Sequence, residues 1–176
     1  MIVLRIFQAL VGVALALAAA LVQGHAPPFG FGLSVVGESE QANGSWQGVD
    51  LLLHPGAPAE RFQILVRPTQ GAQFTLDELT PDGPRRIYPA AGQSGLLRAD
   101  RAYALPGPRQ FYERSGPTHL RLAVGGAGSA SGRGGPGPAR SGRISQDVAR
   151  LSDGSRMPVT EQSFTAGEGG WVDLGQ

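Results

Sequence analysis

Apolar and polar residues alternate in three stretches of the chain, and this alternation constrains the fold more than any other feature. The stretches are Arg61–Arg67, Gln73–Leu79 and His119–Val124. A period of two places apolar side chains on one face of an extended strand and polar side chains on the other. Such a pattern is typical of antiparallel strands that cover a core on one side and meet water on the other.

Turn-forming residues separate these stretches. Pro and Gly occur together in Pro68–Gly71, Pro81–Pro84, Pro106–Pro108 and Ser115–Pro117, and the whole chain contains 27 Gly and 14 Pro. Pro presets the first dihedral of a turn and Gly accepts a positive φ. No stretch with a helical period lies between residues 49 and 124. We therefore predict an all-β fold, a small antiparallel β-sandwich over residues 49–124, with a small barrel as the alternative.

The segments on either side of this domain are less regular. Residues 25–48 are rich in Gly and Pro and can contribute one edge strand at Leu33–Val36. Residues 125–143 consist largely of Gly, Ser and Pro and predict a flexible linker or loop. Residues 144–176 form a short C-terminal segment, in which Ile144–Leu151 predicts two helical turns. Residues 159–174 either return to the sandwich or form a tail, and the isolated Trp171 favours return.

The N-terminus has the pattern of an export signal. Arg5 precedes an almost wholly apolar run, and small residues follow it up to Gly24. This pattern predicts a signal peptide over residues 1–24, cleaved after Gly24 or, as an alternative, after Ala20. We expect the mature chain in the periplasm. If residues 1–22 are not cleaved, they form a helix that anchors the protein in the inner membrane.

Composition excludes several classes of site. The chain contains no Cys, which excludes disulfides, thiolate zinc sites, a cysteine nucleophile and a lipid-modified N-terminus. Removal of residues 1–24 takes away one Arg and reduces the formal net charge from +1 to zero, so we expect no nucleic-acid partner. The three dispersed arginines Arg133, Arg140 and Arg143 are better explained by a solvated loop than by an anionic partner.

No catalytic pattern stands out. His25, His54 and His119 show no metal-ligand spacing, and no Gly-x-Ser-x-Gly motif is present. Asp77 and Glu78 are adjacent on a predicted strand, so their side chains point to opposite faces and cannot act together on one bond. We expect no catalytic residues, no metal and no cofactor.

Aromatic and basic side chains suggest a binding face instead. Tyrosines and arginines on neighbouring predicted strands can form an outward surface for a peptide or a glycan. Ordinary cross-strand pairing that supports the sheet is the simpler interpretation of the same residues. The candidate face consists of Tyr88, Tyr103, Arg109, Tyr112, Arg114 and Arg121.

The stretch from Glu60 to Val124 contains strand and turn motifs in a distinctive order. These are Phe62–Val66, Phe74–Leu79, Asp82-Gly83, Ile87-Tyr88-Pro89, Leu97–Asp100, Tyr103–Pro106, Phe111-Tyr112-Glu113, Ser115-Gly116-Pro117 and His119–Val124. In the order of these motifs, the stretch resembles a bacterial exported domain family of unknown function, often appended to caspase-like peptidase or protein kinase modules. The resemblance implies a β-sandwich module for reading or presenting a partner, with no established catalytic residues.

These observations favour a non-enzymatic periplasmic binding or adaptor domain whose partner is another envelope protein or a peptide segment. The alternative is a structural envelope protein tethered by an uncleaved N-terminal helix, and a small exported hydrolase ranks last. If the outward face is the binding surface, Tyr112→Ala and Arg114→Ala should weaken partner binding and leave folding largely intact.

Overall fold

The computed structural model describes residues 29–113, 118–125, 137–166 and 169–175. All regular structure in these residues is β, in two antiparallel sheets packed face to face, which confirms the predicted small β-sandwich. Within the described residues, no helix is long and apolar enough to cross a membrane. The predicted signal peptide at residues 1–24 lies outside the described residues.

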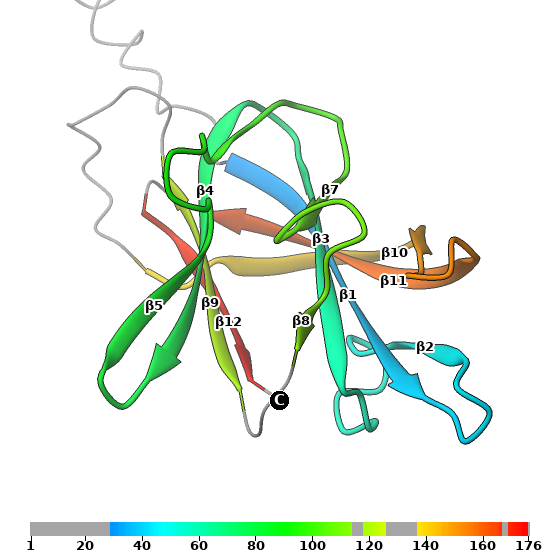
Figure 1. Ribbon diagram of the computed structural model, residues 1–176. Coiled ribbons are helices and arrows are strands. Elements are labelled where there is room, and N and C mark those ends of the chain that lie inside the picture. Colours follow the sequence, from blue (N-terminus) through cyan, green and yellow to red (C-terminus); the bar gives the residue numbers. More distant parts are fainter. Residues whose placement is uncertain (1–28, 114–117, 126–136, 167–168, 176) are drawn as a thin grey trace, which may run out of the picture.

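The first sheet has seven strands and is built around β1 (Figure 1). Its order is β10 (Arg140–Arg150), β11 (Arg156–Ala166), β1 (Phe29–Glu40), β3 (Arg61–Pro68) and β7 (Tyr103–Leu105). Two shorter strands extend it, because β2 (Trp46–Asp50) pairs with β1 and β8 (Tyr112–Glu113) pairs with β3.

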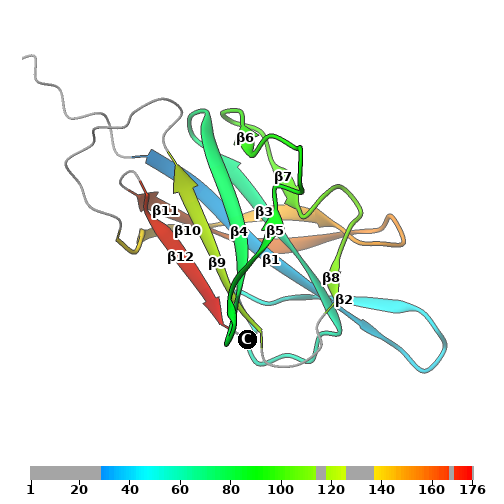
Figure 2. The same ribbon diagram turned by 60° about the vertical axis from the view of Figure 1, so that its left-hand side comes forward.

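The second sheet has five strands in the order β12 (Trp171–Gly175), β9 (His119–Gly125), β4 (Ala72–Thr80) and β5 (Gly83–Tyr88). Its fifth strand, β6 (Leu96–Leu97), pairs with the start of β4. Figure 2 shows β12, β9 and β4 side by side in this sheet. The alternating stretches of the sequence correspond to β3, β4 and β9, and each places its apolar set in the core.

Four phenylalanines lie at the centre of the core. The Phe31 ring stacks on that of Phe164 at 5.5 Å between centroids and meets Phe74 edge-on at 5.6 Å. Phe29 also meets Phe74, so β1, β4 and β11 are held together by one aromatic cluster. Edge-to-face and offset contacts of this kind add to the free energy gained by burying the rings.

The sequence predictions for the N-terminal flank and for the bounds of the sandwich are wrong. β1 is a central strand of twelve residues rather than an edge strand at Leu33–Val36, and it is buried from Phe31 to Glu38. Because both of its faces are covered, alternation is lost, and Gly30, Gly32 and Gly37 further hide the pattern. The sandwich is therefore not limited to residues 49–124 but extends from Phe29 to Gly175.

The predicted helix at Ile144–Leu151 is a strand. Residues 140–150 form β10, which pairs along its length with β11 and begins within the predicted linker 125–143. Residues 126–136 of that linker lie outside the described residues. Ile144, Val148 and Leu151 are spaced as on one face of a helix, whereas in the structure the first two are exposed on an edge strand. The other two C-terminal strands return to the sandwich, since β11 pairs with β1 and β12 with β9.

The face of the first sheet that points away from the second sheet is called the outer face. The β10–β11 hairpin, which pairs with the start of β1, crosses the outer face of the neighbouring strands (Figure 1). Val36 of β1 packs there against Ala149, Leu151 and Val159 of the hairpin in a small second core. Gly32 and Gly48 provide the clearance: a Cβ on Gly32 would lie 2.5 Å from the Glu161 carboxyl carbon, and one on Gly48 would lie 2.5 Å from the Met157 sulfur. The hairpin therefore forms one wall of a groove on this face.

Candidate functional site

A hollow lies beside β7, where the first sheet ends. It has a volume of about 660 Å³ and is lined by the end of β5, the loops around β6 and the segment from Arg101 to Gly107. Tyr88 and Tyr103 both line it, so the fold brings together two members of the predicted binding face. We call this hollow the tyrosine cleft.

The two tyrosines are half-buried and held in place. Burial raises the pKa of the Tyr88 phenol, and the neighbouring Tyr103 raises this pKa further. The Tyr103 hydroxyl accepts a hydrogen bond from the backbone N–H of Arg98 at 3.0 Å, and the Arg101 guanidinium carbon lies 5.6 Å from the Tyr103 ring centroid. Rings fixed in this way offer apolar area and a polar tip to a ligand at a low cost in conformational entropy.

A second hollow of about 350 Å³ lies on the outer face of the first sheet. Its walls come from β3, β7, the β10–β11 hairpin and the turn after β7. The lining residues are Gln63, Leu65, Ala102, Ala104, Pro108, Arg109, Val148 and Arg150. We call it the outer groove. It shares Ala102, Ala104 and Pro108 with the tyrosine cleft. β7 therefore borders both hollows.

The turn at Gly107–Gln110 is fixed from beneath by a buried side chain of β3. Gln63 is 3% exposed, and its amide nitrogen donates to the carbonyls of Gly107 at 3.1 Å and of Gln110 at 2.9 Å. The Gln110 N–H closes the turn by donating to the Gly107 carbonyl at 3.0 Å. Gln63 thus positions the residue at the tip of this turn, Arg109.

Arg109 has a φ of +59°, which is unusual for a residue with a side chain. Pro108 precedes it, so the pair has the pattern of a type II turn, in which Gly or Asn is normally preferred at the second central position. A left-handed residue other than Gly costs roughly 1–2 kcal/mol of conformational energy. Such strain directs attention to the side chain that it displays.

The charged residues that line the two hollows are all arginines. Arg101 lines the tyrosine cleft, while Arg109 and Arg150 line the outer groove. Among the described residues, the ion pairs of the structure involve other arginines, namely Arg61, Arg67, Arg85, Arg86 and Arg121. The side chains that line the two hollows therefore carry positive charge and no negative charge.

Two further members of the predicted face, Tyr112 and Arg121, line neither hollow. Tyr112 packs its ring on the buried Phe62 at 5.1 Å between centroids, and its hydroxyl accepts a hydrogen bond from Arg85 at 2.9 Å. Tyr112 is therefore part of the support of the core, and Tyr112→Ala should not leave folding intact. Burial raises the pKa of Tyr112, chiefly because the ring is desolvated.

Arg121 belongs to the second sheet. Its guanidinium pairs with its ladder neighbour Asp173 at 2.7 Å and lies 4.9 Å from the Trp171 ring centroid. The hydrogen bond from Arg121 holds the pKa of the Asp173 carboxyl below its usual range. Arg114 lies outside the described residues. The six residues therefore do not form one described surface, and only Tyr88, Tyr103 and Arg109 line the two joined hollows.

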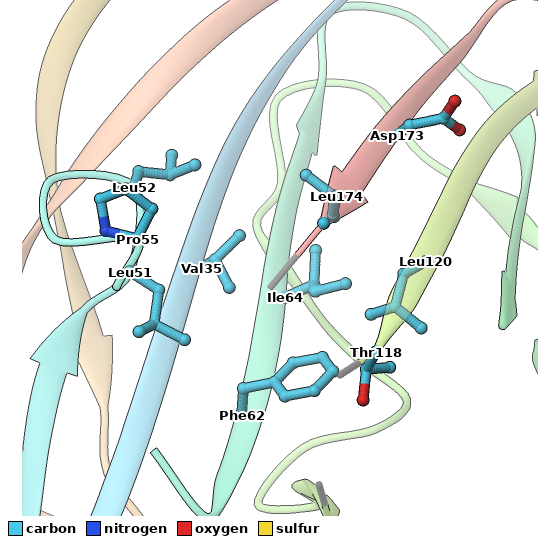
Figure 3. Close-up of a pocket in the computed structure, with 11 residues that line it drawn as sticks. Val35, Leu51, Leu52, Pro55, Phe62, Ile64, Thr118, Leu120, Asp173 and Leu174 are labelled. Atoms are coloured by element: carbon cyan, nitrogen blue, oxygen red, sulfur yellow. The ribbon is translucent and has the colours of Figure 1, made fainter. Parts of the chain in front are cut away.

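A third hollow, of about 160 Å³, lies between the sheets at the end of β12 (Figure 3). Phe62 and Ile64 of β3 face Leu120 and Leu174 of the second sheet across it, and the β2–β3 connection lies alongside. Its walls are largely apolar core side chains with only Thr118 and Asp173 as polar lining. Its small volume and apolar walls make it part of the core packing rather than a recognition site.

Acidic and histidine residues do not gather in the described part of the chain: no group of three or more of them there is arranged to hold a metal ion. The most buried carboxylate, Glu38, is 0% exposed and is bound by Arg61 and by the backbone N–H of Ser152 at 2.7 Å. This arrangement holds strands together and does not open to a hollow.

Sequence reasoning missed Gln63, Arg101 and Arg150. Gln63 falls on the polar side of an alternating strand and was expected to face water, whereas the turn after β7 and the hairpin cover that face. Arg150 comes to the site only through the long-range pairing of β10. One available signal was Gly107-Pro108-Arg109-Gln110, in which Pro predicts a turn and places Arg where Gly is usual.

No protein-family model, curated protein or solved structure matches the chain. The resemblance of residues 60–124 to a family of exported domains accordingly stays a prediction.

Proposed function

We propose that the chain is a non-enzymatic binding or adaptor domain that acts in the periplasm, and that it holds a peptide segment of another envelope protein in the tyrosine cleft. The observation that carries this proposal is the cleft of about 660 Å³ lined by Tyr88 and Tyr103. The export pattern of residues 1–24 supports the location.

The chemistry of the cleft supports a peptide ligand. Its lining combines two aromatic rings, the prolines Pro106 and Pro108, and the amides of Gln93 and Gln110. Aromatic and proline surfaces pack against apolar side chains, and side-chain amides can pair with a peptide backbone. The cleft also lies on a two-sheet scaffold, which holds its walls in a fixed arrangement before the ligand arrives.

The test is a titration of the isotope-labelled mature chain with a library of extended octapeptides, followed by amide chemical shifts. We expect shifts at Tyr88, Tyr103 and Gln93, and a loss of affinity in Tyr103→Ala. Tyr103→Phe should retain most of the affinity, because the ring supplies the contact area. Leu53→Ala is the matched control, since Leu53 is 63% exposed and lines none of the hollows described above. Shifts spread over the surface, or none at all, would refute the proposal.

The alternative of a tethered structural protein is tested on the same protein in cells. N-terminal sequencing of the envelope fraction should find a start at His25 if the signal is cleaved after Gly24. Retention of Met1 in the membrane fraction would instead favour the structural protein anchored through residues 1–22.

A further inference from the structure

Among the described residues, β7 is an edge strand that pairs with another strand on one side only. The first sheet ends at β7, which pairs through Tyr103–Leu105 with Val66, Leu65 and Ile64 of β3. In an antiparallel ladder, the N–H and C=O of alternate residues point toward the partner strand and those between them point away. Whether Ala104 or its two neighbours in β7 form the hydrogen bonds to β3, the other residues of β7 direct their backbone donors and acceptors away from β3. These groups are a template for an additional strand.

The position of this edge gives an added strand two places for its side chains. Ala104 pairs with Leu65 of β3, and both residues line the outer groove. Tyr103 and Leu105, whose side chains point to the opposite face of β7 from that of Ala104, line the tyrosine cleft. Successive side chains of a strand point to opposite faces of the sheet. A peptide that pairs with β7 would therefore direct alternate side chains toward the tyrosine cleft and the outer groove.

The charge around the outer groove selects the kind of peptide. Arg109 and Arg150 line it together with Leu65 and Val148, and no carboxylate is among its lining residues. Arginine is suited to this task because its guanidinium forms bidentate, charge-assisted hydrogen bonds with carboxylates. The tyrosine cleft offers mainly aromatic and apolar area to the opposite face of the peptide.

The strained turn supports the same assignment. The chain keeps Arg109 at a φ of +59°, and it uses the buried Gln63 to fix the two carbonyls that flank the turn. Gly or Asn would occupy this backbone position at lower cost. The energetic cost of Arg at this position is explained if its charge contacts a ligand.

We propose that β7 binds an extended peptide of alternating acidic and apolar residues as an added strand, with its carboxylates toward Arg109 and Arg150 and its apolar side chains toward the tyrosine cleft. This inference rests on the proposed function, because it specifies the peptide that the cleft receives. It adds two features to that function, backbone pairing with β7 and selection for negative charge.

The experiment compares three labelled octapeptides on the mature chain. The first alternates Val and Glu, the second alternates Val and Gln, and the third is the Val–Glu peptide N-methylated at every backbone nitrogen. We expect the acidic peptide to bind about tenfold more tightly than the amide peptide, as one or two charge-assisted hydrogen bonds would produce. N-methylation should abolish binding, since it removes the backbone donors that pair with an edge strand.

Variants assign the effect to residues. Arg109→Asn keeps a side chain that tolerates the left-handed conformation and removes the charge, and Arg150→Gln removes the charge on the facing strand. Each should reduce affinity for the acidic peptide about threefold, so that the two together account for the tenfold preference, and leave affinity for the amide peptide unchanged. Arg143→Asn is the matched control, because Arg143 is exposed on β10 and lines none of the described hollows.

Each other outcome is decisive. Equal affinities for the Glu and Gln peptides, with amide shifts at Tyr88 and Tyr103, would overturn the acidic-strand inference and leave the proposed function standing. Acidic binding that survives N-methylation, or that maps to β10, would also overturn it. Failure of every peptide to shift the tyrosine cleft would overturn both.

Discussion

Glu38 and Arg61 face each other in the ladder between β1 and β3, and a guanidinium nitrogen of Arg61 lies 2.7 Å from a carboxylate oxygen of the fully buried Glu38. The same guanidinium donates to the Ser152 hydroxyl at 2.6 Å, and its carbon lies 3.3 Å from the Trp46 ring centroid. One ion pair thus joins the two central strands to β2 and to the tip of the β10–β11 hairpin.

Removal of Arg61 should strongly destabilise the fold. Arg61→Ala leaves the Glu38 charge buried without its partner, and breaking a buried pair in this way typically costs about 3–5 kcal/mol. Chemical denaturation monitored by tryptophan fluorescence measures the loss. Arg86→Ala is the control, because the Arg86 pair with Asp77 is solvent-exposed and screened, and its removal should barely move the midpoint. Equal effects of the two variants would contradict the structure.

Gly37 should not tolerate a methyl group. A Cβ at this position would lie 2.6 Å from the Ala59 Cβ and 2.9 Å from a Leu51 methyl group, in a packed part of the core. Overpacking of this kind costs about 1–3 kcal/mol, so Gly37→Ala should lower the thermal midpoint. Gly56→Ala should leave the midpoint unchanged or raise it slightly, since no atom lies within 4 Å of its Cβ position. A neutral Gly37→Ala would show that β1 and the β2–β3 connection are less tightly packed.

Gln63 should hold the turn that carries Arg109. Gln63→Leu keeps the volume of the side chain but removes hydrogen bonds to two carbonyls, a loss of about 1–3 kcal/mol. Amide hydrogen exchange should become faster at Gln110, whose N–H closes the turn, and stay unchanged at the remote Leu122. Gln73→Leu serves as the control, because Gln73 is exposed on β4. Unchanged exchange in the turn would mean that Gln63 does not position it.

Acid should weaken the contact between the sheets at Tyr112. The hydrogen bond with Tyr112, assisted by Arg85, holds the pKa of the Glu78 carboxyl below its usual range. A lowered folded-state pKa contributes stability at neutral pH that is lost as the pH falls through that pKa. Tyr112→Phe should therefore reduce the stability difference between pH 7 and the acidic range.

Denaturation midpoints at the two pH values measure this effect. Tyr103→Phe is the control, since the Tyr103 hydroxyl contacts only a backbone N–H, that of Arg98, in the hydrogen bond described above. This variant should lose a similar amount of stability at both pH values. A pH dependence that is the same in Tyr112→Phe as in the unmodified chain would contradict the assigned role of Tyr112.

The alternation of apolar and polar residues along the chain predicts much of the second sheet, and it also predicts β3 of the first sheet. β3, β4 and β9 each have one buried and one less buried face, and their alternation is therefore visible in the sequence. The Pro and Gly turns between them also follow from local backbone preferences. Tyr88, Tyr103 and Arg109 belong to the face predicted from aromatic and basic residues on neighbouring strands, and in the structure these three line the two hollows.

What only the tertiary structure decided is the set of long-range pairings. β1 loses its alternation because the second sheet covers one face and the hairpin covers the other. β10 lacks alternation because most of it is exposed, so its apolar spacing resembles that of a helix. The outer groove combines Gln63, Ala104, Arg109 and Arg150 from segments far apart in the chain. Local sequence encodes which residues favour an extended strand, whereas the neighbour that buries each strand is set by packing across the whole domain.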